Sequence, residues 1–160
     1  MMNNKANYTK INQELDNEHD KIFKSLYTLL NLCNINIANK TEYDVFKVNI
    51  MNGIKHTYDI AKQHWKTEQK YFNYGNKNKP YGHHNIQNEI NKHVKEHTNN
   101  LKDIAKFYKS MEKSSFKSRD DVMKKIYYIK NIINQFIKQI ETHINTMDHP
   151  HFSHWVRNLK

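Results

Sequence analysis

Apolar residues recur at three- and four-residue steps along four long stretches of the chain. Such spacing predicts amphipathic helices, each with one apolar face. The 160 residues include only 3 glycines and 2 prolines, so turn-forming residues seldom interrupt the pattern. No strand-like alternation competes with it. We therefore expect an all-α protein, an up-down-up-down antiparallel four-helix bundle that forms a single domain over residues 1–160.

Three polar breaks set the expected helix boundaries. The expected helices cover residues 15–33, about 44–74, 86–108 and 122–147. Thr41 with Asp44, and Ser118 with Asp121, are placed like N-terminal capping pairs of the second and fourth helices. Pro150 is expected to stop the last helix.

Charge and cysteine content restrict the class of protein. The formal charge is +10, but the lysines are scattered over every expected helix, which favours a solvated surface over nucleic-acid binding. The single cysteine, Cys33, excludes an intrachain disulfide and fits a reducing compartment. The N-terminus has no apolar core of a signal peptide, and no long apolar run predicts a membrane span. We expect a soluble cytoplasmic protein with no nucleic-acid or membrane partner.

The apolar face of each expected helix, which should point into the bundle, also carries polar residues that a purely apolar core would exclude. They are His19 on the first helix, His64 and Glu68 on the second, His93 and His97 on the third, and His143 and Asp148 at the end of the fourth. In an up-down bundle all seven meet at one end. A lone histidine there is more often a hydrogen-bonded core residue, but buried carboxylates need a partner or a proton. The set predicts a bound cation.

The donor types narrow the choice of metal. Five imidazoles and two carboxylates exceed what one ion uses, whereas two octahedral ions bridged by both carboxylates account for the whole set. Thiolates are absent, which argues against a structural zinc cluster. Imidazole donors suit iron in both its ferrous and ferric states. The Glu-x-x-His motif of the other class of di-iron bundle is missing.

Four short motifs, taken in order, resemble the hemerythrin family across nearly the whole chain. "DNEHDKIF" looks like the histidine motif of the first helix and "HWKTE" like the His-x-x-x-Glu of the second. "HVKEH" looks like the His-x-x-x-His of the third helix, and "HINTMD" like the closing histidine and aspartate. Each motif alone is ordinary, whereas the ordered set of four is specific.

The resemblance implies a function and a role for each ligand. It implies reversible O2 binding at a non-haem centre of two iron ions with a bridging oxo or hydroxo group. One iron would be held by His93, His97 and His143 and the other by His19 and His64, with Glu68 and Asp148 as bridging carboxylates. The two-histidine iron would keep an open position for O2.

Four apolar residues neighbour the expected ligands by helical spacing. They are Ile22, Trp65, Ile140 and Ile144. We expect them to line a dry O2 pocket that slows oxidation of the irons. For any one of them, ordinary core packing explains the position equally well.

The chain also departs from the family pattern. The segment between Glu68 and His93 is longer than is common, through an insertion at residues 73–84. His83 and His84 compete there as ligands, but neither has a histidine four positions on, so we favour His93 and His97. The tryptophan usual near the N-terminus is missing, with Tyr8 as a replacement, and three further histidines follow Asp148. These are His149, His151 and His154.

Three other functions compete with O2 carriage, storage or delivery. The same site could sense O2, NO or iron, or it could detoxify peroxide or NO. No further inward acid, base or nucleophile accompanies the ligands, which argues against an enzyme. Nucleic-acid binding rests on the charge alone.

Overall fold

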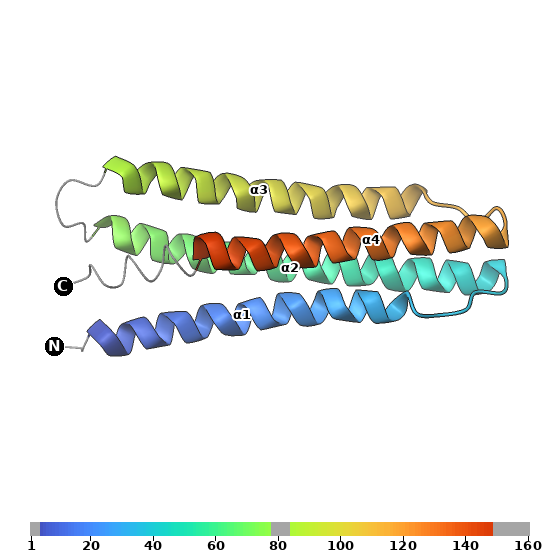
Figure 1. Cartoon of the computed structure of the whole chain (residues 1–160), viewed down its shortest axis with the longest axis horizontal. Coiled ribbons are helices and arrows are strands. Elements are labelled where there is room, and N and C mark those ends of the chain that lie inside the picture. The colour runs from blue at the N-terminus through green and yellow to red at the C-terminus, as the bar shows by residue number, and fades with distance from the viewer. Residues whose placement is uncertain (1–3, 78–83, 149–160) are drawn as a thin grey trace.

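Four long helices lie side by side and alternate in direction (Figure 1). The computed structural model describes residues 4–77 and 84–148 and, within them, the side chains of residues 10–71, 88 and 90–146. The elements are α1 (Asn4–Leu32), α2 (Lys40–Lys77), α3 (His84–Lys113), α4 (Arg119–His143) and a π-helical turn, η1 (Ile144–Asp148). No strand occurs in these described ranges, and the predicted all-α four-helix bundle is confirmed.

Side-chain caps fix the starts of two helices. Ser118 precedes α4 and accepts a hydrogen bond from the Asp121 amide at 3.1 Å, as predicted. The predicted cap of α2 at Thr41 is wrong, because that helix begins one residue earlier, at Lys40. The Asn39 side chain accepts a hydrogen bond from the Glu42 amide at 2.9 Å, and the Glu42 carboxylate accepts one from Ala38 N–H. Asn39 therefore satisfies one of the free amides of the first turn.

Several helix ends differ from the boundaries predicted from the sequence at the end of the bundle where α2 ends and α3 begins. α2 continues to Lys77 and α3 already begins at His84, so the two helices include both ends of the segment 73–84, which the resemblance marks as an insertion. α4 stops being α-helical at His143, four residues before the predicted end, and continues as η1. Figure 1 shows that α4 ends short of the other three helices.

A large core and a small apolar cluster lie on either side of the polar residues of the interior. The large core, which includes Phe46, Ile50 and Ile129, fills most of the bundle. The small cluster is built on Leu15 and Ile90, with the half-buried side chains of Ile11, Tyr71 and Val94 packed against it. Leu15 lies one turn before His19, and Ile90 lies nearly one turn before His93, so the small cluster caps the polar layer.

At Gly53, α2 packs tightly against Leu29 of α1. A Cβ atom placed on Gly53 would lie 2.4 Å from Leu29 Cδ2 and 3.3 Å from Leu29 Cγ. Replacing Gly53 with valine should lower the free energy of unfolding by about 1–3 kcal/mol, because Leu29 is packed in the core and must move. Urea denaturation measures the loss, and Asn52→Val, at an exposed neighbouring position, is the matched control. A Gly53→Val protein as stable as the control would contradict this packing.

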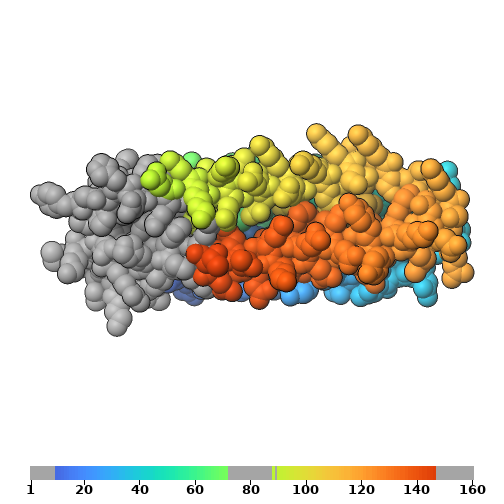
Figure 2. Space-filling model, turned by 45° about the horizontal axis from the view of Figure 1, so that its top comes forward, coloured from blue at the N-terminus to red at the C-terminus, as the bar shows by residue number. Residues whose placement is uncertain are grey.

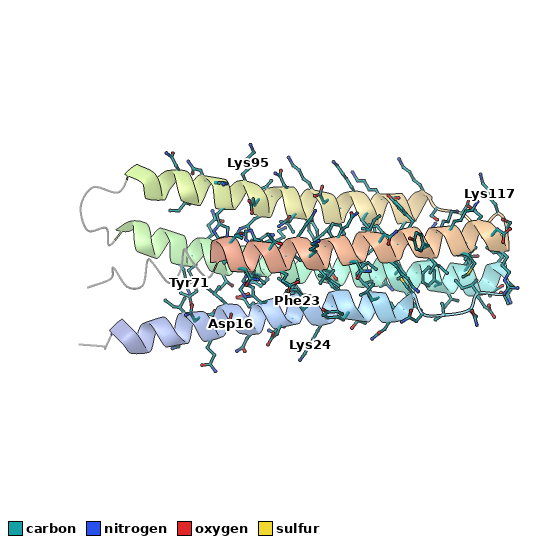
Figure 3. All side chains as sticks on the ribbon, viewed as in Figure 1. Asp16, Phe23, Lys24, Tyr71, Lys95 and Lys117 are labelled. Atoms are coloured by element: carbon teal, nitrogen blue, oxygen red, sulfur yellow. The ribbon has the colours of Figure 1, made fainter. Side chains whose placement is uncertain are left out.

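Charged side chains cover the outside of the bundle. Lys24 on α1 and Lys95 on α3 are exposed and point away from it on opposite sides (Figure 3). Within the described ranges, no helix combines the length and the apolar character needed to cross a membrane.

Candidate metal centre

Six of the seven predicted metal ligands come together inside the bundle. They are His19 from α1, His64 and Glu68 from α2, His93 and His97 from α3, and His143 at the end of α4. Their exposed fractions lie between 0% and 5%, and Glu68 is 0% exposed. A fully buried carboxylate among imidazoles is a costly arrangement unless a cation compensates it.

Three histidines and Glu68 form the first group of donors. His143 Nε2 lies 2.9 Å from His93 Nε2 and 3.0 Å from His97 Nε2. Glu68 Oε2 lies 2.8 Å from His97 Nε2 and 3.3 Å from His93 Nε2. Atoms bound to one metal ion at about 2.1 Å and at right angles lie about 3 Å apart. The four donor atoms therefore have the spacing of ligands around a common ion.

The second group uses the other oxygen of the same carboxylate. Glu68 Oε1 lies 2.8 Å from His64 Nε2 and 4.0 Å from His19 Nε2. The imidazole rings of His19 and His64 meet edge to face, with centroids 4.5 Å apart. Glu68 is therefore common to a three-histidine group and a two-histidine group.

The electrostatics of Glu68 show how strongly this site favours negative charge on the carboxylate. Burial alone would raise its pKa, but the imidazoles of His19, His64, His93 and His97 outweigh burial and hold the pKa well below its usual range. Neither carboxylate oxygen accepts a hydrogen bond of ordinary geometry from the described residues, although imidazole nitrogens lie within 2.8 Å. The oxygens thus keep lone pairs for a cation.

His97 is poised as a neutral donor. Burial lowers the pKa of His97, and the neighbouring Glu68 carboxylate only partly offsets that effect. The indole ring of Trp65 stacks on His97, with centroids 4.0 Å apart and planes 4° apart. This stacking fixes the orientation of the imidazole. Neutral imidazole is the form that coordinates a metal.

Two carboxylates that the sequence analysis missed contact the predicted ligands from outside the two donor groups. Glu96 Oε2 lies 2.8 Å from His143 Nδ1, and Glu18 Oε2 lies 3.7 Å from His64 Nδ1 while it accepts a hydrogen bond from Thr67. Burial would raise the pKa of Glu18, but His64 and Thr67 lower it overall. Each glutamate directly precedes a predicted ligand, His19 or His97, and this Glu-His dipeptide was the available signal.

The seventh predicted ligand, Asp148, closes the π-helical turn, and its side chain lies outside the described residues. In an α-helix, positions five apart are about 140° apart around the axis. A π-helix bonds residue i to residue i+5 and so brings these two positions closer together around the axis. The turn η1 therefore brings the backbone of Asp148 toward the face of His143, which a continuous α-helix would not do.

The other residues singled out in the sequence are either buried or have side chains outside the described residues. The four predicted pocket residues are all buried, with exposed fractions of 0% for Ile22, 7% for Trp65, 4% for Ile140 and 7% for Ile144. All four belong to the large apolar core. The side chains of Tyr8, His83, His84, His149, His151 and His154 lie outside the described residues.

The donor set fits a metal centre. Its buried imidazoles and carboxylate could hold a metal ion in either group, and the two groups share one carboxylate. Comparison with models of known protein families, with curated proteins and with solved structures finds no match to this chain. The functional argument therefore rests on the geometry of these residues.

Proposed function

We propose that this bundle binds two iron ions and uses them to bind O2 reversibly, for carriage, storage or delivery. His93, His97 and His143 would hold one iron, and His19 and His64 the other. Glu68 and Asp148 would bridge them. The observation that supports this most is the buried carboxylate of Glu68, with one oxygen 2.8 Å from His97 Nε2 and the other 2.8 Å from His64 Nε2.

The number of donors on each side supports an O2 site at one iron. When bound, a pair of ferrous ions supplies the two electrons on which reversible O2 binding draws. The three-histidine group gives its ion one more protein donor than the two-histidine group. The proposal therefore assigns O2 to the side of His19 and His64, where fewer protein donors compete with it.

The chain around the ligands would keep water away from the reduced ions. On one side lies the large core with Ile22, Trp65 and Ile140, and on the other lies the small cluster of Leu15 and Ile90. These apolar side chains leave little room for water and lower the local dielectric. Such an environment favours release of O2 over irreversible oxidation.

The visible absorption spectrum tests the function directly. Iron-loaded protein is reduced with dithionite, desalted without air, and measured before air is admitted, in air, and after O2 is removed. A band that appears with O2 and disappears on its removal supports reversible binding. Absence of any new band in air contradicts the proposal. An irreversible change to the ferric spectrum also contradicts it and favours sensing or redox turnover at the same site.

Acid should release the iron at a pH set by the histidines. Burial lowers the pKa of His97, so this donor stays neutral as the pH falls through the ordinary histidine value of about 6.5. Below that value protons compete for five imidazoles together, and we expect loss of iron to be steep and complete by about pH 4. The iron content that remains after desalting at each pH measures this loss. Full iron content at pH 4 would contradict five histidine ligands.

A further inference from the structure

A carboxylate outside the metal-binding groups contacts the ring nitrogen of His143 that faces away from them. Glu96 Oε2 lies 2.8 Å from His143 Nδ1, while His143 Nε2 lies 2.9–3.0 Å from the Nε2 atoms of His93 and His97. The imidazole thus presents one nitrogen to the site and the other to Glu96. The side chain of Glu96 reaches from α3 to α4 to make this contact.

The position of Glu96 on its helix explains the contact. Consecutive residues of an α-helix are about 100° apart around the axis, so when His97 faces the bundle interior, Glu96 faces a neighbouring helix. That neighbour is α4, which lies beside α3 on the face shown in Figure 2. His143 is the last α-helical residue of α4. Its orientation is therefore not fixed by a following α-helical turn.

The two residues in contact line a polar groove. A groove of about 480 Å³ between α3 and α4 is lined by Glu96, His143 and amide side chains such as those of Asn99 and Gln139. The Glu96 side chain is 41% exposed, whereas that of His143 is 3% exposed. Glu96 therefore connects a buried imidazole with the surface. A structural core contact would not need a half-exposed carboxylate.

We propose that Glu96 is a positioning residue, which keeps the proton of His143 on Nδ1 and so places the lone pair of Nε2 toward the metal-binding groups. This inference rests on the proposed metal site, although not on O2 as its ligand. An ionised carboxylate only accepts hydrogen bonds, so Nδ1 of His143 must donate. With Nδ1 protonated, a neutral imidazole has its lone pair on Nε2, which is the atom directed at His93 and His97.

The tautomer of His143 is the first readout. In metal-free, ¹⁵N-histidine-labelled protein, NMR correlation spectra show which ring nitrogen carries the proton, and loss of the signal in His143→Gln identifies the residue. We expect Nδ1–H in the wild-type protein and in Glu96→Gln, whose amide oxygen still accepts. We expect an increased Nε2–H population in Glu96→Leu. Wild-type His143 protonated mainly on Nε2 would overturn the inference without any variant.

Metal affinity is the second readout. Competition between protein and a coloured chelator for Zn²⁺ should show affinity about 10- to 100-fold weaker for Glu96→Leu and a smaller loss for Glu96→Gln. Glu112→Leu, which removes an exposed charge from the far end of α3, is the control and should bind like the wild type. Wild-type affinity and tautomer in Glu96→Leu would overturn the inference. Failure to bind O2 would overturn the proposed function and leave both readouts of Glu96 intact.

Discussion

Glu68→Gln should reduce iron binding from two ions per chain to nearly none. Among the described side chains, the carboxylate of Glu68 is the one donor common to both groups, and glutamine keeps its size but removes the charge. Changes of groups beyond the ligands already cost about 10- to 100-fold in metal affinity, so loss of a shared ligand should cost at least about 100-fold at each ion. Metal analysis after anaerobic reconstitution, with chelator competition, measures both ions.

Each possible number of ions retained by Glu68→Gln leads to a different conclusion. Glu112→Gln removes the same charge from an exposed position and should keep both ions. One ion retained at full affinity in Glu68→Gln would mean that the carboxylate serves a single ion. Two ions retained would mean that the buried cluster is not the metal site. Circular dichroism of the metal-free variant establishes that the bundle still forms.

Iron loading should raise the thermal midpoint of unfolding by about 10 °C. A ligand present at 1,000 times its dissociation constant adds about 4 kcal/mol to the free energy of unfolding, and 1 kcal/mol shifts the midpoint of a chain of this size by about 2–4 °C. The physical source is the buried Glu68 carboxylate and its imidazoles, which lack a cation in the metal-free protein. Anaerobic calorimetry with and without ferrous iron measures the shift.

Glu68→Gln separates specific stabilisation from general effects of iron. Because this variant lacks the shared ligand, iron should leave its midpoint unchanged, while iron should stabilise Glu112→Gln like the wild type. Equal midpoints for loaded and metal-free wild-type protein would show that any bound iron is incidental and exposed. That outcome would also remove the basis for a site built into the core.

The periodicity of apolar residues was sufficient to predict the fold, because each helix buries one continuous stripe. The same stripes led to His64 and Glu68 on α2 and to His93 and His97 on α3, since positions four apart share a helix face. Up-down connectivity then predicted their common end. These predictions depend only on helical spacing and chain order, which a sequence contains in full.

Other features depend on contacts between helices or on backbone detail, which the sequence does not contain. The predicted Thr41 cap failed because several polar residues before α2 suit a cap, and only the backbone path shows that Asn39 accepts the hydrogen bond. The contact between Glu96 and His143 requires the rotation of α3 relative to α4. The π-helical turn η1 has no apolar period that would distinguish it from the end of an α-helix.

The turn η1 sets the rotation of the chain after His143. The number of residues in the segment 144–148 therefore matters as much as their identity. Between His143 and Asp148, one residue added or removed would turn the final carboxylate position by roughly a quarter of a turn around the axis of this π-helical segment. Substitutions within the segment preserve that register, whereas insertions and deletions do not. In the connection between α1 and α2, by contrast, a residue added within the exposed segment 34–36 leaves the register of both helices unchanged. Descendants of this sequence that keep the centre should therefore vary in loop length but preserve the spacing of the C-terminal motif.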